Sequence, residues 1–421
     1  MNQSASQWVG TRLSIMMFLQ YLIWGAWYVS AYLYLGDIGF GGNEIKWTYS
    51  VGPIAGILSP FFVGMIADRF FSTEKVLAVL HFLAGLAMYA STMAMSSERP
   101  SPAVINLLFF AHMLCYFPTL ALTNSIAFHN MRNPEREFPI VRVFGTLGWI
   151  VAGLFISWRA WDAGIEPFYF AAGAAILMGG YCLTLPHTPP PSVGKAVSSR
   201  ELLGLDALVL FKNRAFLTFM ICSFLICIPL SFYYQMATKF ITQAGIEAPT
   251  AKMGLGQWSE TIFMVVMPWF FARLGVKWML FVGMLAWVLR YALFAIGAPG
   301  GVVWMLITGI VLHGICYDFF FVTGQLYVDK MAPRKIRSQA QGLLVLITLG
   351  LGMLIGAQVA GSIEVAFTTG EGNAAVVDWQ QVWMLPAIFA GTVMILFTFL
   401  FRPREDSAGT EGAEPATATA S

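Results

Sequence analysis

Four ionisable side chains lie inside long apolar stretches of the sequence. They are Arg142, Glu260, Arg290 and Asp318. A charged group at the centre of a lipid bilayer costs at least about 2.5 to 3.5 kcal/mol on insertion scales, so it faces a cavity or a partner. Burial favours the neutral carboxyl group and a nearby cation favours the carboxylate, so Asp318 is a candidate to take up and release a proton. We assign proton coupling to Asp318 and, second, to Glu260.

We expect different partners for the two arginines, Arg142 and Arg290. Glu260 is expected to bind a substrate or to pair across the molecule with Arg142, and a purely structural ion pair is the alternative. For Arg142 the alternative is a helix-end side chain that reaches the aqueous surface. Arg290 is expected to be structural, paired with Asp318 or with backbone carbonyls.

Polar and aromatic side chains accompany these charges at helical spacing. Arg142, Thr146 and Trp149 share one face at i, i+4 and i+7. A guanidinium, a hydroxyl and an indole can hold a polar ring by hydrogen bonds and stacking. Further candidate substrate-binding residues are Ser231, Tyr234, Gln235, Gln257, His313 and Tyr317, and a stripe of Gln20, Trp24 and Trp27 could face the same pathway. For His313 a packing role is the alternative.

Composition excludes most other classes of protein. Of 421 residues, 58% are hydrophobic and only 11% charged, whereas a soluble domain carries roughly 25% charged residues. A net charge of +2 offers no basic field for nucleic acid, so no nucleic-acid partner is expected. The five cysteines form no C-x-x-C pair and no metal-ligand spacing, so we expect small core residues and no metal site.

Apolar segments of membrane-spanning length follow one another along the whole chain. A bilayer core about 30 Å thick needs about 20 apolar residues as a helix. We predict an all-α integral membrane protein with twelve transmembrane helices near residues 13–35, 47–67, 75–96, 103–127, 139–158, 167–186, 215–241, 252–272, 277–297, 301–328, 338–366 and 380–401.

The longest polar stretch divides these segments into six and six. We predict an N-terminal bundle at 1–186, a cytoplasmic linker at 187–213, a C-terminal bundle at 214–403 and a disordered cytoplasmic tail at 404–421. Within the linker, Leu202 to Phe211 is expected to form a short amphipathic helix on the membrane surface. Most loop Lys and Arg residues lie on the side of the two termini, so both termini are expected to be cytoplasmic.

Several strings in the sequence resemble a known transporter family. Gly64-Met-Ile-Ala67-Asp68-Arg69 resembles the loop signature of the major facilitator superfamily. Over essentially its whole length the chain resembles the bacterial nucleoside/proton symporters of that superfamily. The strings that carry this resemblance are Gln20-Tyr-Leu-Ile-Trp24-Gly25-Ala-Trp27, Arg142-Val-Phe-Gly145-Thr146-Leu-Gly148, Gln257-Trp-Ser-Glu260-Thr, Ala286-Trp287-Val-Leu-Arg290, Asp318-Phe-Phe and Asp378-Trp379-Gln380-Gln-Val-Trp383.

The resemblance implies residue roles and also shows departures. It implies nucleoside binding by Arg142, Thr146, Trp149, Gln257, Glu260 and Tyr317, and proton coupling by Asp318. Where the family pattern has Gln and Asn on the seventh segment, this chain has Ser231 and Tyr234, with Gln235 adjacent. His313 replaces a Tyr, and Trp149 stands where a Phe is usual.

Together these features predict a secondary active transporter that imports nucleosides by proton symport with alternating access. A proton-coupled sugar or polyol symporter of the same fold is the alternative, since the same groups bind hydroxyls. An enzyme is not expected, because no convincing catalytic motif is present. We expect no cofactor besides the co-transported proton, action as a monomer, and a place in the lipid bilayer of a bacterial cytoplasmic (inner) membrane.

Overall fold

The computed structural model of this chain describes residues 3–62, 71–190, 205–333, 336–370 and 375–402. In these ranges the chain is a bundle of long helices, and its only strands are β1 (Thr368–Thr369) and β2 (Val376–Val377), which pair antiparallel. The loop signature at 64–69, linker residues 191–204 and the whole predicted tail at 404–421 lie outside the described residues.

The first half of the bundle contains seven described helices. They are α1 (Gln3–Trp27), α2 (Ala31–Asp37), α3 (Gly42–Phe62), α5 (Thr73–Met95), α6 (Pro102–Asn130), α7 (Pro134–Trp158) and α8 (Glu166–Cys182). Proline occupies the first or second position of α6, α7 and α8, where its missing N–H leaves no helix bond unmade.

The second half begins with a cap that the sequence provides. The Asn213 side chain accepts hydrogen bonds from the Ala215 and Phe216 amides, at 2.9 and 3.2 Å, and so starts α10. This half contains η2 (Leu205–Lys212), α10 (Arg214–Gln243), α11 (Pro249–Gly297), α12 (Val303–Val311), α13 (His313–Cys316), η3 (Tyr317–Val322), α14 (Thr323–Met331), α15 (Arg337–Val345), η5 (Leu346–Gly352), α16 (Met353–Ala366) and α17 (Trp379–Leu400).

All twelve predicted apolar segments fall on helices. Within the described residues, nine helical stretches are long and apolar enough to cross a membrane. One of them, the 49-residue α11, turns at Gly275, whose φ of 64° suits a residue without a Cβ. It therefore holds both the eighth and the ninth predicted segment, while α3 and α8 coincide with the second and the sixth.

Three predicted segments are less regular than expected. The first is divided between α1 and α2, with a turn at residues 28–30. The tenth is divided into α12, α13, the π-helical η3 and α14, and the eleventh contains the π-helical η5. The predicted short helix at Leu202–Phe211 is a 3-10 helix over Leu205–Lys212, and residues 202–204 lie outside the described part.

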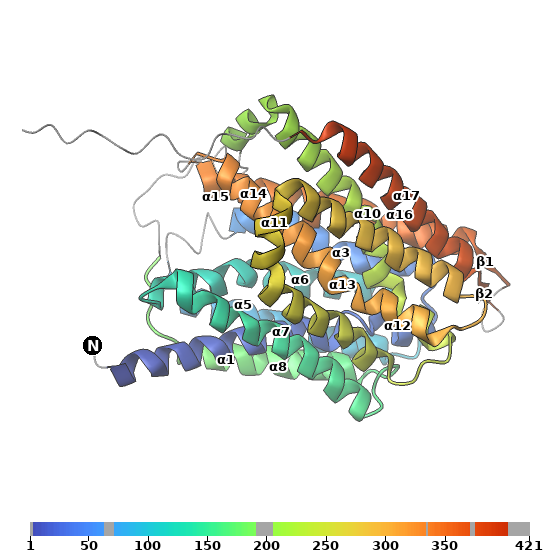
Figure 1. Cartoon of the computed structure of the whole chain (residues 1–421). Coiled ribbons are helices and arrows are strands. Elements are labelled where there is room, and N and C mark those ends of the chain that lie inside the picture. The colour runs from blue at the N-terminus through green and yellow to red at the C-terminus, as the bar shows by residue number, and fades with distance from the viewer. Residues whose placement is uncertain (1–2, 63–70, 191–204, 334–335, 371–374, 403–421) are drawn as a thin grey trace, which may run out of the picture.

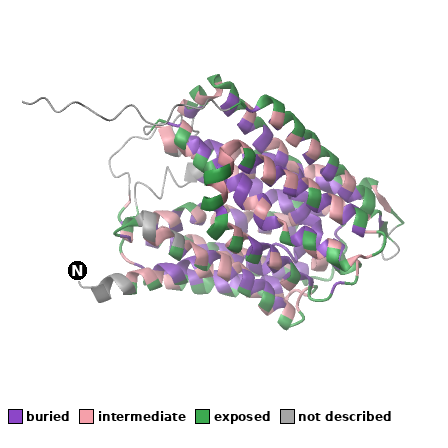
Figure 2. Ribbon diagram, in the orientation of Figure 1, coloured by how far each residue is buried: buried purple, intermediate pink, exposed green. Residues whose placement is uncertain are grey.

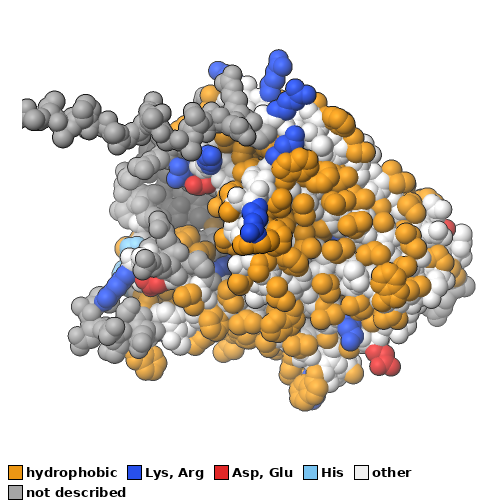
Figure 3. Space-filling view, in the orientation of Figure 1, with side chains coloured by type: hydrophobic (Ala, Val, Ile, Leu, Met, Phe, Trp, Pro, Cys, Tyr) orange, Lys and Arg blue, Asp and Glu red, His pale blue; other side chains and the backbone are white. Residues whose placement is uncertain are grey.

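The helices form two groups around separate cores (Figure 1). One hydrophobic cluster contains residues between 13 and 185 together with Ala357, and the other contains residues between 207 and 401. Figure 2 shows the buried residues along the centre of the bundle and the exposed ones on its outer faces. Hydrophobic side chains cover most of the surface in Figure 3, and Lys and Arg gather near one end, which suits a lipid-embedded protein.

We call the end of the bundle where α1 begins and α17 finishes the terminal end, and the opposite end the distal end. At the distal end, polar contacts join the two halves. Tyr32 of α2 donates a hydrogen bond to Glu364 of α16, and Lys239 of α10 pairs with the same carboxylate at 2.7 Å. Nearby, the Gln358 amide donates to Ser50 at 2.9 Å. Lys239 thus forms an ion pair with a buried carboxylate.

A second distal contact joins α7 to α11. Asp162, just beyond α7, accepts a hydrogen bond from the Thr250 amide at 3.0 Å, and the Ser157 hydroxyl accepts one from the Ala251 amide at 2.9 Å. These side chains satisfy amides in the first turn of α11, which have no partner within that helix. The two halves are thereby held together at the distal end at two separate places.

Close packing of α1 on α7 depends on Gly148. A Cβ at this position would overlap the carbonyl oxygen of Phe18. Because that obstacle is backbone, Gly148→Ala is expected to force α1 and α7 apart and to lower stability by about 1 to 3 kcal/mol. The thermal unfolding midpoint of the purified protein measures this loss. Gly173→Ala is the control, since nothing lies within 4 Å of its Cβ position, and an equal fall in both variants would contradict the explanation.

Candidate functional site

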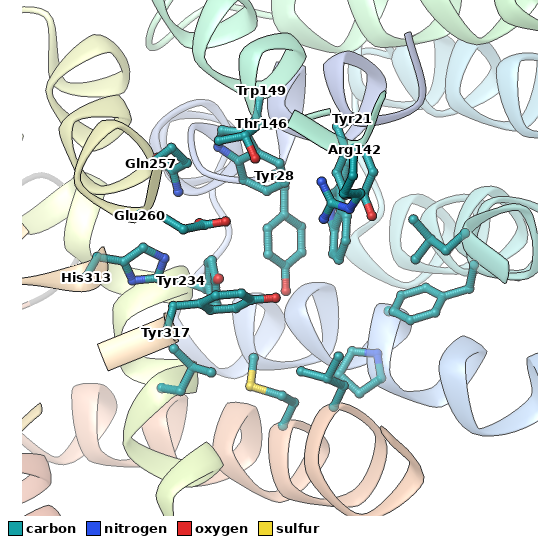
Figure 4. Close-up of a pocket in the computed structure, with 18 residues that line it drawn as sticks. Tyr21, Tyr28, Arg142, Thr146, Trp149, Tyr234, Gln257, Glu260, His313 and Tyr317 are labelled. Atoms are coloured by element: carbon teal, nitrogen blue, oxygen red, sulfur yellow. The ribbon is translucent and has the colours of Figure 1, made fainter. Parts of the chain in front are cut away.

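A cavity of about 210 Å³ lies between the two halves (Figure 4). Both halves contribute to its wall, so neither half encloses it alone. The lining residues are Tyr21, Trp24, Tyr28, Gly52, Pro53, Phe117, Leu120, Arg142, Thr146 and Trp149 from the first half, and Leu230, Tyr234, Gln257, Glu260, His313, Tyr317, Leu349 and Met353 from the second.

Opposite charges face each other across this cavity without touching. Arg142 on α7 and Glu260 on α11 point into it from opposite sides (Figure 4). Among the described residues, no nitrogen–oxygen distance of 4.0 Å or less makes an ion pair for either side chain. The Arg142 guanidinium lies 4.2 Å from the centre of the Tyr21 ring, a cation–π contact that orients it. The predicted direct pair is therefore not formed, and the space between the charges can admit a ligand.

Aromatic rings from the first half build one wall of the cavity. Trp149 meets Trp24 edge to face at a centroid distance of 5.6 Å, and Trp24 meets Tyr28 and Phe117 at 5.6 and 5.8 Å. Edge-to-face contacts of this kind are favourable and fix ring orientation. The contact with Trp24 thus fixes the Trp149 indole, which presents a flat surface beside Arg142 and Thr146.

The opposite wall combines aromatic rings with the His313 imidazole. His313 stacks on Tyr233 at 5.1 Å and lies 5.9 Å from the Tyr317 ring. Tyr234 meets the His313 ring edge to face at 6.1 Å and, across the cavity, lies 5.9 Å from Tyr28. A planar solute would meet aromatic side chains from both halves.

Small residues bring the helices that carry these side chains close together. A Cβ at Gly314 would overlap the backbone of Ser259 and Glu260, and one at Gly256 would lie 3.1 Å from the Cβ of His313. Without those methyl groups, α13 packs directly on α11, as small residues allow in membrane bundles. The positions of Glu260 and His313 are therefore set by backbone contact.

Asp318 lies behind the wall, in the π-helical η3 directly after the lining residue Tyr317. Its side chain is fully buried, and within the described part of the chain neither carboxylate oxygen has a hydrogen-bond partner. A buried unpartnered carboxylate is costly. π-helical turns inside α-helices occur frequently at functional sites, and this one carries the carboxyl group for which the sequence offers no structural role.

Arg290 does not pair with Asp318, contrary to the first of its predicted partners. Its Nη1 atom lies 3.2 Å from Nδ1 of His313, and its guanidinium lies 3.8 Å from the Tyr233 ring centre. In the described ranges no carboxylate forms an ion pair with it. The buried cation is instead held by an imidazole and an aromatic face.

The cavity lining suits the binding of a solute. No group of three or more His, Cys, Asp or Glu that could hold a metal ion occurs among the residues described. The cavity offers hydrogen-bonding groups of both kinds and flat aromatic surfaces, which suits a polar solute with a planar ring.

Comparison with known proteins assigns the family. Residues 8–406 match the family model described as nucleoside H+ symporter. The chain belongs to this family. It is 41% identical to the putative nucleoside transporter YegT of Escherichia coli K12, over 94% of each chain. It is 30% identical to the nucleoside permease NupG of the same organism, over 92% of this chain and 94% of that one.

The nucleoside H+ symporter family also accounts for the fold. The crystal structure of the nucleoside transporter NupG superimposes with a TM-score of 0.83 at 29% identity, covering 94% of this chain and all of that one. The predicted all-α membrane fold of the major facilitator superfamily is confirmed, and the chain is a multi-pass membrane protein.

Eight predicted site residues of this symporter line the cavity, and three do not. Ser231 is buried and donates a hydrogen bond to the Met353 carbonyl at 3.0 Å. Gln235 is also buried outside the wall, and Asp318 lies behind it. Substrate contact by Ser231 and Gln235 therefore has no support from this geometry. Those in the wall are Arg142, Thr146, Trp149, Tyr234, Gln257, Glu260, His313 and Tyr317.

On α1 the predicted stripe of cavity-facing residues is displaced by one residue at both of its ends. Tyr21, Trp24 and Tyr28 line the cavity, whereas Gln20 bonds to Thr119 at 2.7 Å inside the first half. Trp27 stacks on Phe109 at 5.1 Å, also away from the cavity. Only Trp24 belongs to both stripes. The i, i+3, i+7 spacing of Tyr21, Trp24 and Tyr28 was an available signal for the correct face.

Glu364 is a buried acid that sequence reasoning did not single out. It lies near the end of α16, is 2% exposed and holds the distal contact with Lys239. A lone acid in an apolar segment and a lone lysine near the end of another were together a signal for this pair.

Thiol labelling tests which of these side chains reach the cavity. In a chain whose five cysteines are replaced, Thr146→Cys is expected to react with a small membrane-permeant thiol reagent, because Thr146 lines the cavity. Ser231→Cys is the matched control, expected to react at least an order of magnitude more slowly because Ser231 is 2% exposed. Mass spectrometry measures both rates. Equal labelling of the two variants would contradict the described wall.

Proposed function

We propose that this chain imports nucleosides together with protons by alternating access. The observation that carries the proposal is the unpaired Arg142 and Glu260 facing one another across a cavity shared by both halves. Membership of the nucleoside H+ symporter family and likeness to NupG support the choice of substrate.

The chemistry of the lining suits the two parts of a nucleoside. Ribose hydroxyls both donate and accept hydrogen bonds, and Glu260, Gln257 and Arg142 provide acceptors and donors. Gln257 has a buried side-chain oxygen without a partner in the described part of the chain. Trp149 and Tyr317 offer faces for a planar base, and stacking contributes about 1 to 3 kcal/mol per base.

Asp318 is the proposed carrier of the proton, with Glu260 as a second candidate. In the described part of the chain neither of its carboxylate oxygens has a hydrogen-bond partner, and Asp318 directly follows the lining residue Tyr317. A proton moving down about 150 mV releases roughly 3.5 kcal/mol, which corresponds to a concentration ratio of about a few hundredfold for a neutral solute. No cofactor and no covalent step are needed, so the chain is not proposed to be an enzyme.

The setting of this activity is the cytoplasmic membrane of a bacterium. Loop Lys and Arg residues gather on the side of the termini, which supports cytoplasmic termini. The terminal end of the bundle would then face the cytoplasm, and the joined distal end the outside. The cavity lies between the two halves of one chain, and we propose that the chain acts as a monomer.

Competition for binding tests the substrate class. Binding of one labelled nucleoside to the purified protein is measured against unlabelled purine nucleosides, pyrimidine nucleosides, free bases and sugars. Nucleosides are expected to compete and sugars to have no effect, because only a nucleoside uses both the polar groups and the aromatic faces. Binding of sugars in preference to every nucleoside would support the sugar symporter and overturn the proposal.

Replacement of the buried acid tests proton coupling. Asp318→Asn removes the titrating group while keeping its size, so accumulation driven by an imposed proton gradient is expected to be lost while nucleoside binding or exchange continues. Uptake into vesicles measures accumulation. Asp37→Asn at the exposed end of α2 makes the same chemical change and should leave uptake intact. Normal accumulation by Asp318→Asn would rule out its role.

A further inference from the structure

Arg290 and His313 form a buried pair that touches the cavity only through the imidazole. Arg290 is fully buried on α11, and His313 is 1% exposed on α13. The guanidinium Nη1 lies 3.2 Å from His313 Nδ1, and the Tyr233 ring lies 3.8 Å from the guanidinium carbon on one side. The same Tyr233 ring stacks on the imidazole at 5.1 Å, with 20° between the planes. Both partners are therefore held in place.

The direction of this hydrogen bond fixes where the imidazole carries its proton. A guanidinium has five N–H donors and no acceptor, and it stays protonated in proteins. Nδ1 of His313 must therefore accept, which leaves the hydrogen of the neutral ring on Nε2. A doubly protonated ring would direct an N–H at a cation and lose this bond.

The Nε2 atom is the one that remains available to a ligand. Within the described part of the chain it has no hydrogen-bond partner, and it is not among the polar atoms shut off from solvent, unlike Nδ1 of His81 and Nε2 of His112. His313 is a lining residue, and its ring points into the cavity in Figure 4. His313 therefore presents a single fixed donor at the cavity wall.

The surroundings of that donor suit a base better than a ribose. His313 lies among the rings of Tyr233, Tyr234 and Tyr317, while the carboxylate and amide that could serve ribose hydroxyls are on α11. A planar heterocycle in the cavity that packs against the lining rings of Tyr234 and Tyr317 brings its edge, with oxo oxygens and ring nitrogens, to the level of Nε2.

We propose that Arg290 is a positioning residue that locks His313 as an Nε2–H donor, so that the cavity selects nucleobases with a hydrogen-bond acceptor at this edge. The selection rests on the proposed nucleoside function, whereas the locked tautomer does not. Arg290 itself does not touch the substrate. His313 is a specificity-determining residue that is not a proton carrier.

Nitrogen NMR of the full chain in lipid nanodiscs tests the lock directly. With all five histidines labelled with 15N, the His313 signals are those lost in His313→Gln. We expect an unprotonated Nδ1 and a protonated Nε2, and a mixture of tautomers in Arg290→Met. Arg290→Lys, which keeps a donor cation, should retain the single tautomer. A protonated Nδ1 in the unaltered chain would overturn the lock even if no variant folds, and an unchanged tautomer in Arg290→Met would overturn the role of Arg290.

Matched nucleosides test the selection. Inosine and 6-thioinosine, and uridine and 4-thiouridine, differ by one oxo oxygen replaced with a weakly accepting sulfur, and adenosine and its deaza analogues differ by single ring nitrogens. The unaltered chain should bind the member with the acceptor about tenfold more tightly in at least one pair, as expected for one hydrogen bond. His313→Phe should bind both members of that pair equally, and Arg290→Met should lose most of the difference.

The outcomes separate the two proposals. If the unaltered chain binds nucleosides but distinguishes no pair, or if His313→Phe keeps the distinction, the selection is overturned and the nucleoside function stands. If the chain binds no nucleoside at all, the function and the selection both fail, and the NMR result still decides the tautomer.

Discussion

An arginine and a glutamate inside an apolar bundle attract each other strongly, because little water is present to screen them. Here Arg142 and Glu260 belong to different halves and face one cavity, yet no ion pair joins them. A direct salt bridge would fill the space that a substrate must occupy and would oppose its entry. The separation is maintained by neighbours, since Tyr21 lies against the guanidinium and Gly314 lets α13 pack on the backbone at Glu260. A substrate that hydrogen-bonds to both groups can therefore link the two halves.

Polar contacts and close helix packing together hold the distal end closed. Opening this end separates α3 from α16, which pack together at Gly42 and Gly361. It also separates Glu364 from Tyr32 and Lys239, and Asp162 from the first turn of α11. Each group would then need water or another partner, which a protein surface at the membrane boundary provides. Alternating access requires such contacts to break on one side while the opposite side closes, and polar contacts at a wet end permit this at modest free-energy cost. The apolar cores within each half, by contrast, remain packed as units.

Much of the fold and of the site follows from the sequence, and the failures have physical causes. Segment length and hydrophobicity located the long apolar helices, and each predicted segment overlaps a described helix, because lipid demands internally bonded backbone. The charges in those segments located the cavity, because a charged side chain inside the bilayer must face a cavity or a partner. The phase of α1 was wrong by one residue, since Gln20 and Tyr21 are both plausible on a polar face and only packing against α6 decides between them. Ser231 could not be excluded either, because its partner is a backbone carbonyl on α16.

The irregular helices escaped prediction, and they matter for coupling. Nothing in the residue pattern of Tyr317–Val322 distinguishes a π-helical turn from an α-helical one, because both use the same apolar residues. The turn places Tyr317 in the cavity wall and Asp318 behind it. A carboxyl group that touched the substrate directly would bind proton and substrate in competition for the same atoms. If Asp318 carries the proton as proposed, separation by one residue lets both be bound at once, and protonation of Asp318 and occupation of the cavity then act on the same segment of helix through its backbone.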